Sequence, residues 1–277
     1  MSYNNRMIAY GIVAHGGAGS PKDLSDGVRA AAETAFHLLE KGNKALDAVV
    51  EAVKILEDDG RYNAGVGSHL RLDGKTIEMD AAIMDSGGAL GTVMAIRRVR
   101  NPVLIARAVS GTPHVALAGR GAEAFARKLG FPRCYHVSPQ SLANFEQIRG
   151  LIEKGKIEKM NPRWKGLVAT KLSTDTVGAV AVDRNGVFAV ATSTGGASPM
   201  LVGRVGDTPL IGCGFYAGPV CTVAVTGLGE EIVKRMTARY VYDYVEKGGT
   251  AQEACQTAVH LFPSDVPVGI ISISRID

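Results

Sequence analysis

Thr176 is the residue whose position in this sequence permits the most specific chemistry. It opens a strongly apolar segment, Val177–Val182, well inside the 277-residue chain. A cut of the chain before Thr176 would give this residue a free α-amine next to its own hydroxyl group. An α-amine has a reference pKa of about 7.7 to 8.0 and is therefore substantially unprotonated at neutral pH. Thr176 would then supply both a nucleophile and a general base, the pair that covalent catalysis requires.

Other patterns that could do chemistry each lack an essential part. His15–Gly19 is similar to the glycine-rich oxyanion loop of esterases, but the sequence contains no G-x-S-x-G nucleophile elbow. Gly74-Lys75-Thr76 matches only the end of a phosphate-binding loop. The six histidines and four cysteines are scattered without the spacing of metal ligands. Thr176 itself also has an ordinary interpretation, because threonine is favoured in strands.

The composition is that of a globular protein and argues against several classes of partner. Apolar residues make up 46% of the chain, enough for a sizeable core. Basic residues number 31 against 27 acidic ones, so we expect no nucleic-acid partner. The lysine-rich stretch Lys154–Lys171 contains Glu158 and is interpreted as a solvated loop. We find neither a secretory signal nor an apolar run near the roughly 20 residues of a membrane span, and therefore expect a cytoplasmic protein without a membrane partner.

A β-hairpin is expected to position Thr176. Thr176–Val182 and Val187–Ala191 are almost continuously apolar, and the turn signal Asp183–Gly186 joins them. Strands that are apolar on both faces need cover on both faces. Further strands are expected at Met7–Ala14, Leu70–Leu72, Ile77–Met84, Thr92–Ile96, Leu210–Gly212, Cys221–Val225 and Val268–Ser274. The pattern weakens between Phe131 and Leu172, which is the best candidate for a linker.

Amphipathic segments predict the helices that cover these strands. They lie at Lys22–Lys41, Ala45–Leu56, after Asn101-Pro102, at Ala122–Leu129, Glu230–Glu246 and Thr250–Leu261. Hairpins with helices on their outer sides predict two sheets packed face to face between helical layers.

Six short motifs occur in the order found in one enzyme family. They are His15–Gly19 (HGGAG), Tyr62–Gly67 (YNAGVG), Asp175–Gly178 (DTVG), Thr192–Gly196 (TSTGG), Gly203–Asp207 (GRVGD) and Thr226–Gly229 (TGLG). Together they resemble the plant-type L-asparaginase and isoaspartyl peptidase family of N-terminal-nucleophile hydrolases. The resemblance runs from about Ile8 to Ser274, nearly the whole chain, and six motifs in the right order are far more specific than any one of them.

The resemblance implies a fold and a processing step. The fold is α+β, a four-layer αββα sandwich formed by a single domain over residues 1–277. The chain would be a precursor that cuts itself between Asp175 and Thr176. An α chain of residues 1–175, with a mobile linker at about 133–175, would stay bound to a β chain of residues 176–277. A dimer of such αβ heterodimers is the implied assembly.

The resemblance also assigns catalytic roles. Thr176 would be the nucleophile, and Thr194 in the adjacent strand would hydrogen-bond it and tune its basicity. Asn63 would support the nucleophile from the second motif. The Thr226 hydroxyl and the Gly227 backbone N–H would stabilise the oxyanion, a contribution typically worth a hundredfold to a thousandfold in rate.

The substrate pocket implied by the resemblance selects an aspartyl group. Arg204 would bind the α-carboxylate, which its guanidinium group fits in geometry, and Asp207 would bind the α-ammonium. The remaining pocket residues would be Val205, Gly206, Thr226, Gly227, Leu228 and Gly229. Leu228 stands where many members of the family have histidine.

The implied activity is hydrolysis of L-asparagine to L-aspartate and ammonia, and of β-aspartyl (isoaspartyl) dipeptides, through an acyl-enzyme. No cofactor would take part in catalysis. A structural sodium ion would bind backbone carbonyls of Leu56, Glu57, Asp59, Tyr62, Ala64 and Val66. Two alternatives stay open: a glycosylasparaginase-type amidase that acts on N-linked glycans, and an uncut homologue that serves as a binding or scaffold protein.

Overall fold

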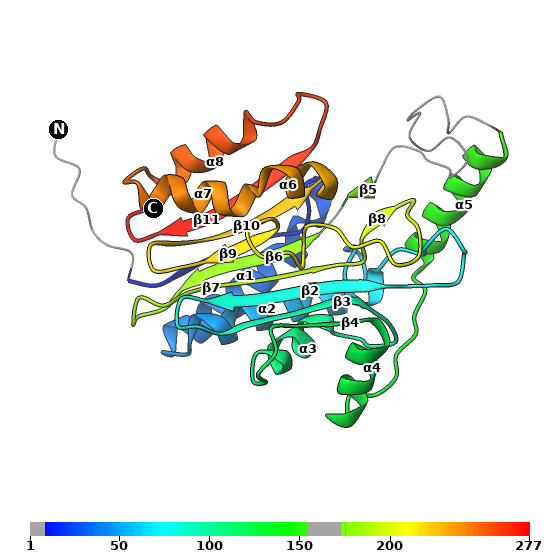
Figure 1. Cartoon of the computed structure of the whole chain (residues 1–277), viewed down its shortest axis with the longest axis horizontal. Coiled ribbons are helices and arrows are strands. Elements are labelled where there is room, and N and C mark those ends of the chain that lie inside the picture. Colours follow the sequence, from blue (N-terminus) through cyan, green and yellow to red (C-terminus); the bar gives the residue numbers. More distant parts are fainter. Residues whose placement is uncertain (1–8, 155–172, 175) are drawn as a thin grey trace.

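The computed structural model describes residues 9–154, 173–174 and 176–277. Two β-sheets pack face to face, and helices cover the outer side of each sheet (Figure 1). The larger sheet has the strand order β1-β6-β7-β2-β3-β4, and the smaller one has the order β11-β10-β9. The predicted α+β class and the αββα sandwich are thereby confirmed.

The larger sheet contains the predicted hairpin at its centre. Its strands are β1 (Gly11–His15), β6 (Val177–Val182), β7 (Phe188–Thr194), β2 (Met79–Asp85), β3 (Leu90–Ile96) and β4 (Ala116–Ala118). Every residue of β6 and β7 is buried, as their continuous apolar character requires. The two strands pair antiparallel, with Val177 opposite Ser193. The residue before β6 therefore lies at the end of the sheet where β7 finishes.

Alternation along β6 divides its side chains between two cores. Ala179 and Ala181 face the helices that cover the larger sheet, whereas Val180 and Val182 face the smaller sheet. Successive strand residues point to opposite faces, so both faces of this strand are covered. The core between the sheets is completed from the smaller sheet by side chains such as Phe215.

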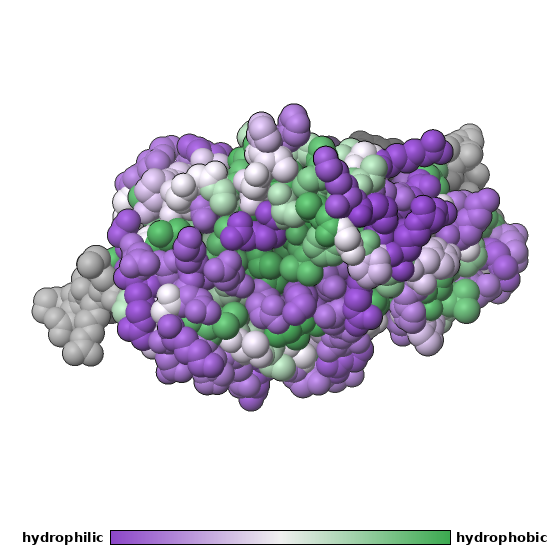
Figure 2. All heavy atoms as spheres, turned by 90° about the horizontal axis from the view of Figure 1, so that it is seen from below, coloured by the Kyte–Doolittle hydropathy of each residue, from purple (hydrophilic) through white to green (hydrophobic). Residues whose placement is uncertain are grey.

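The helices on the larger sheet come from the first half of the chain. They are α1 (Ser25–Glu40), α2 (Ala45–Asp59), α3 (Pro102–Val109) and α4 (Gly119–Lys128), with short 3₁₀ turns η1 (Lys22–Leu24) and η2 (Gly65–Gly67). In α1, Ala31, Ala35 and Leu39 recur every four residues and are fully buried. Figure 2 shows the molecule from below the view of Figure 1, with apolar residues at the centre of that face and polar residues around them.

The smaller sheet and its helices come from the end of the chain. The strands are β9 (Phe215–Ala217), β10 (Cys221–Gly227) and β11 (Val268–Ser274), and the helices are α6 (Gly229–Arg235), α7 (Thr237–Glu246) and α8 (Ala251–Val259). The sequence predicted one continuous helix over Glu230–Glu246, and this prediction was wrong. Met236 adopts a left-handed conformation with φ 48° and separates α6 from α7. The first turn of α7 instead donates backbone hydrogen bonds to the carbonyls of Gly212 and Cys213.

Two predicted strands are absent from the described part of the chain. Leu70–Leu72 forms an irregular segment in which Arg71 N–H donates to Thr76 O at 2.8 Å and Leu72 N–H to Met200 O at 3.1 Å. Leu210–Gly212 is a turn that contributes only an isolated bridge to Phe215. In both places the short apolar run is held by tertiary contacts rather than by a sheet ladder.

The linker prediction overlooked a helix. Helix α5 (Pro139–Glu153) lies within the range of about 133–175, and Ser138 caps it by accepting a hydrogen bond from Ser141 N–H at 3.1 Å. Ser141 Oγ in turn accepts from Leu70 N–H at 3.0 Å, so the helix is attached to the body of the protein. A two-stranded sheet pairs β5 (Ser173–Thr174) with β8 (Ala197–Ser198). Residues 155–172 and 175 lie outside the described residues, and the division into two chains stays a prediction.

Candidate active site

Thr176 lies where β6 begins, and only 6% of its surface is exposed. Because Val177 pairs with Ser193, Thr176 comes beside Thr194, the last residue of β7. The Thr176 hydroxyl oxygen is 3.4 Å from the hydroxyl oxygen of Thr208. Asp175, the other half of the predicted cleavage site, lies outside the described residues.

A small cavity connects Thr176 with residues from distant parts of the sequence. Its lining contains Thr176, Thr194, Arg204, Asp207 and Gly227. The remaining lining residues are Gly196, Ala197 and Thr208. The free space is close to that of one water molecule. The structure therefore brings five of the predicted site residues together around one buried point.

Asn63 supports the turn that follows Thr194. Its side-chain Nδ2 donates to Gly196 O, and its backbone carbonyl accepts from Gly195 N–H at 2.8 Å. The Thr194 hydroxyl oxygen accepts from Gly196 N–H at 2.9 Å. Thr194 is thus fixed both by strand pairing and by its own turn, and Asn63 holds that turn. The support that Asn63 would give to Thr176 stays a prediction.

Thr226 and Gly227 form the end of β10, and the loop of the first motif reaches them. Ala18 N–H donates a hydrogen bond of 3.3 Å to the Thr226 hydroxyl oxygen. That oxygen therefore acts as an acceptor here, and its own hydrogen is left to donate elsewhere. Gly227 lines the cavity, whereas Thr226 is buried and is not among the lining residues. The role of Thr226 and Gly227 as oxyanion donors stays a prediction.

Arg204 carries an ion pair that the sequence did not indicate. Its Nε and Nη2 donate to the two carboxylate oxygens of Glu230 at 3.0 and 2.9 Å. This is the two-pronged geometry in which guanidinium groups bind carboxylates. Glu230 is about half exposed, at 54% of its side chain. The Nε and Nη2 groups of Arg204 are thus occupied by the Glu230 carboxylate, which a second carboxylate would have to replace or share.

Asp207 is a buried carboxyl group with spare bonding capacity. Its Oδ2 has no hydrogen-bond partner among the described residues. Burial raises the pKa of Asp207 to about 7, although the positive charge of Arg204 works in the opposite direction. A buried carboxylate in this state would be stabilised by a cation, and a substrate ammonium group is one.

Gly229 allows Arg204 and Asp207 to approach each other. A methyl group on Gly229 would lie 2.8 Å from both Arg204 Nη2 and Asp207 Oδ1, closer than real contacts allow. Val205 and Gly206 lie between Arg204 and Asp207 in the sequence. Neither is among the described residues that line the cavity. Leu228 precedes α6, and its N–H donates to Pro267 O at 3.3 Å.

Sequence reasoning missed Thr208 and Glu230, and it gave no role to His15, although this residue opens the first motif. Thr208 follows Asp207 directly, and Glu230 follows the last motif, so only their adjacency to motifs could have drawn attention to them. His15 is half-buried where β1 pairs with Gly178 of β6, and both nitrogens of its ring are buried. Burial lowers the pKa of His15 to about 4, so its ring is neutral at pH 7.

Main-chain carbonyls of the segment predicted to hold sodium lie close to the turn at Gly65–Gly67. A methyl group on Gly67 would lie 2.0 Å from Tyr62 O and 2.7 Å from Gly60 O, and one on Gly65 would lie 2.4 Å from Glu57 O. Tyr62 O also accepts from Ala64 N–H at 2.8 Å. Within the described residues, no cluster of His, Cys, Asp or Glu could hold a metal ion. A cation held by this loop would be bound by carbonyl oxygens, which suit a hard cation, and the sodium site stays a prediction.

The sequence matches the family described as asparaginase (Asparaginase_2) over residues 8–276. The chain belongs to this family. Its similarity to the plant-type L-asparaginase of Pyrococcus furiosus is 45% identity over 271 residues, 92% of this chain and 85% of the relative. A similar match, 43% over 275 residues, covers 95% of this chain and 80% of the isoaspartyl peptidase/L-asparaginase of Rattus norvegicus. The isoaspartyl peptidase/L-asparaginase of Danio rerio is 42% identical over 258 residues, 90% of this chain and 80% of its own.

Membership of the asparaginase family confirms the resemblance identified from the six motifs. The motifs lie apart in the sequence, and the sandwich gathers four of them, those of Thr176, Thr194, Arg204 and Gly227, around one cavity. In the described part of the chain, no helix is both long and apolar enough to cross a membrane.

Proposed function

We propose that this asparaginase-family protein is a self-processing threonine amidohydrolase. Its substrates are L-asparagine, which it converts to L-aspartate and ammonia, and β-aspartyl dipeptides. The observation that carries the proposal is the convergence of Thr176, Thr194, Arg204 and Asp207 on one cavity. The names of the relatives from Pyrococcus furiosus and Rattus norvegicus agree with these two substrate classes.

Activation requires a cut at the Asp175–Thr176 bond. Before the cut, the nitrogen of Thr176 belongs to a peptide bond and is not basic. Afterwards it is an α-amine whose reference pKa of about 7.7 to 8.0 suits a general base near neutral pH. This amine and the hydroxyl group belong to the same residue, and the strand register places Thr194 beside it.

In the proposed reaction, Thr176 Oγ attacks the side-chain carbonyl carbon of the substrate and its proton passes to the α-amine. The tetrahedral intermediate collapses as the C–N bond breaks, and the proton moves to the departing nitrogen. Ammonia or an amino acid leaves, and an aspartyl ester remains on Thr176. A water molecule then attacks the ester, which releases aspartate and restores the hydroxyl group.

The oxyanion of the intermediate needs donors placed before the reaction begins. The Gly227 N–H and the Thr226 hydroxyl are the groups we assign to it. The hydrogen bond from Ala18 N–H occupies a lone pair of the Thr226 oxygen and leaves the hydroxyl hydrogen available for the substrate. The first glycine-rich motif thus has a role in orienting an oxyanion donor.

Substrate selection uses the half-buried Arg204 and the buried Asp207. Arg204 would bind the α-carboxylate in place of, or together with, Glu230, and Asp207 would bind the α-ammonium through its unpartnered oxygen. An amide that lacks either group would forgo a charge-assisted hydrogen bond, worth about 1.5 to 3 kcal/mol. The pocket therefore favours amides of the aspartyl side chain over simple amides.

A sodium ion held by the carbonyls of the Leu56–Val66 loop is part of the proposal as a structural element. The close approach of Glu57, Gly60 and Tyr62 carbonyls to the 65–67 turn supports it. Asn63, which holds the turn after Thr194, lies in the same loop. The dimer of αβ heterodimers and the cytoplasmic location stay predictions.

Hydrolysis assays with three substrates test this proposal against its alternatives. Purified protein is incubated with L-asparagine, with a β-aspartyl dipeptide and with an N-glycosyl-asparagine, and aspartate release is measured. Release from the first two supports the proposal. Preference for the third would favour the glycosylasparaginase type, and an uncut, inactive chain that still binds aspartate would favour a binding protein.

A further inference from the structure

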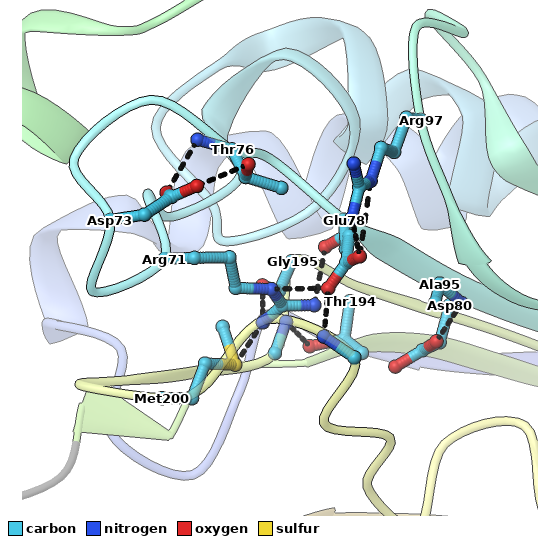
Figure 3. Close-up of polar contacts among 12 residues, drawn as sticks. Arg71, Asp73, Thr76, Glu78, Asp80, Ala95, Arg97, Thr194, Gly195 and Met200 are labelled. Atoms are coloured by element: carbon cyan, nitrogen blue, oxygen red, sulfur yellow. Dashed lines mark hydrogen bonds and ion pairs between the residues drawn. The ribbon is translucent and has the colours of Figure 1, made fainter. Parts of the chain in front are cut away.

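A buried ion pair outside the cavity joins two segments that carry site residues. Arg71 is fully buried, and Glu78, just before β2, is 2% exposed. Arg71 Nε lies 3.2 Å from Glu78 Oε2, and Figure 3 shows the two side chains pointing toward each other. Removing two charges from water is costly unless each also makes further hydrogen bonds. Both Arg71 and Glu78 make such further hydrogen bonds.

Each partner of the pair holds a different part of the candidate site. Glu78 Oε2 accepts a hydrogen bond of 2.6 Å from Gly203 N–H, immediately before Arg204. Arg71 Nη1 donates to Gly195 O at 3.3 Å, immediately after Thr194. The pair also closes on itself, since Arg71 Nη2 donates to Glu78 O at 2.9 Å.

The segment that carries Arg204 depends on such contacts. Residues 199–210 contain neither helix nor strand, so no ladder of backbone hydrogen bonds fixes them. Glu230 holds the guanidinium group, but it lies on helix α6 and is half exposed. Arg204 N–H donates to Leu201 O at 3.2 Å, but both groups belong to this same segment. The charge-assisted bond from Gly203 N–H to Glu78 therefore ties the backbone next to Arg204 to another part of the protein.

We infer that Arg71 and Glu78 are positioning residues, which set the place of Arg204 relative to the turn after Thr194. This inference rests on the proposed function, because it concerns how Arg204 meets the substrate α-carboxylate. Neither residue contacts the substrate. A change that shortens the reach of Glu78 should weaken binding of the α-carboxylate and leave the chemical step nearly intact.

Two substitutions of Glu78 separate reach from charge. Glu78→Asp keeps the negative charge opposite Arg71 but withdraws the carboxylate from Gly203. Glu78→Gln keeps the length and one oxygen acceptor but loses the charge. For processed enzyme we expect Glu78→Asp to raise the KM for L-asparagine about tenfold, the scale of one charge-assisted hydrogen bond, and Glu78→Gln to raise it about threefold or less. The kcat should change by less than about threefold in both.

Arg97 provides the matched control. It bonds the other oxygen of the same carboxylate, Glu78 Oε1, and is 39% exposed. Arg97→Ala removes an ion pair from Glu78 without touching the bond to Gly203, so we expect KM within about twofold of wild type.

Inhibition by two product analogues distinguishes positioning from general damage. The inhibition constant of L-aspartate should rise with Glu78→Asp by the same factor as KM, whereas that of β-alanine, which lacks the α-carboxylate, should not change. Unchanged KM in Glu78→Asp, a larger KM in Glu78→Gln than in Glu78→Asp, or equal weakening of both inhibitors would overturn the inference.

A second variant covers the case in which Glu78→Asp does not fold. Arg71→Lys keeps the charge opposite Glu78, but a single ammonium group cannot reproduce the bonds to both Glu78 and Gly195. KM should again rise about tenfold, and an unchanged KM would contradict the inference. The wild-type protein in the same assay tests the proposed function separately. If it cuts itself and hydrolyses L-asparagine, and the variants have the same KM, only the positioning role of Arg71 and Glu78 fails.

Discussion

Replacing Asp207 by asparagine should make the protein more stable at pH 8 and less active. Burial raises the pKa of this carboxyl group from an ordinary 3.8 to about 7. Each pKa unit corresponds to about 1.4 kcal/mol, so keeping Asp207 ionised at pH 8 costs the folded state about 4 kcal/mol. Asparagine has nearly the same size without the charge. An amide makes different hydrogen bonds from a carboxyl group, so we expect a gain of about 2 to 4 kcal/mol.

The sign of the pH dependence follows from proton binding. Between pH 3.8 and 7 the folded protein holds a proton on Asp207 that the unfolded chain has released. The contribution of Asp207 to the free energy of unfolding is therefore complete at low pH and is lost as the pH rises through 7. Asp207→Asn removes this loss, so its stabilising effect should be large at pH 8 and close to zero at pH 4.

Urea unfolding of uncut chains is the appropriate measurement. Both versions carry Thr176→Ala, which we predict prevents cleavage, so a single chain unfolds in each case. Asp265→Asn, a change at an exposed aspartate, serves as the control. A destabilised Asp207→Asn protein at pH 8, or a stability difference that does not vary with pH, would refute the reasoning. In the enzyme that retains Thr176, Asp207→Asn removes the carboxylate that would bind the substrate ammonium group. We therefore expect a higher KM for L-asparagine at pH 8.

Three further substitutions test individual parts of the site. Arg204→Ala should weaken binding of L-asparagine by about 1.5 to 3 kcal/mol, visible in kcat/KM, and an unchanged kcat/KM would remove Arg204 from the pocket. Thr226→Val should lower kcat about a hundredfold to a thousandfold and should change the free energy of unfolding of the uncut chain little. A normal kcat would exclude the Thr226 hydroxyl as an oxyanion donor. Gly229→Ala places a methyl group 2.8 Å from Arg204 and Asp207; we expect a higher KM at unchanged fold, checked by circular dichroism, and a wild-type KM would show that the pair can shift at no cost.

Much of the fold was predictable because local pattern and tertiary role agree. The hairpin of β6 and β7 has apolar residues on both faces and a turn signal between them, and both faces are buried. Helices α1 and α2 likewise show a buried stripe at helical spacing. In these elements the residues that favour the local structure are the same ones that form the core.

The errors lie where tertiary contacts decide the local structure. Helix α5 buries only Ser141 and Ile148, so its sequence lacks a strong apolar stripe, and its attachment through Leu70 cannot be read from local pattern. The break at Met236 depends on carbonyls of Gly212 and Cys213 that accept from α7. The local sequence of α5 gives no sign of its contact with Leu70, and that of α7 gives no sign of its contacts with Gly212 and Cys213.

The candidate-site residues that could be predicted from the sequence are those that lie within the six motifs. Arg204, Asp207 and Gly227 were identified through resemblance and lie around one cavity with Thr176. The bidentate pair of Arg204 with Glu230 and the bond from Gly203 to Glu78 were not foreseen. Both join residues far apart in the sequence, and only the folded chain brings them together.

The central claim is that Thr176 becomes an N-terminus, and intact-mass measurement tests it most directly. Purified wild-type protein should separate under denaturing conditions into two fragments, residues 1–175 and 176–277, whereas Thr176→Ala should remain one chain of 277 residues. A wild-type protein that hydrolyses L-asparagine while uncut, or a Thr176→Ala protein that still yields both fragments, would contradict the account.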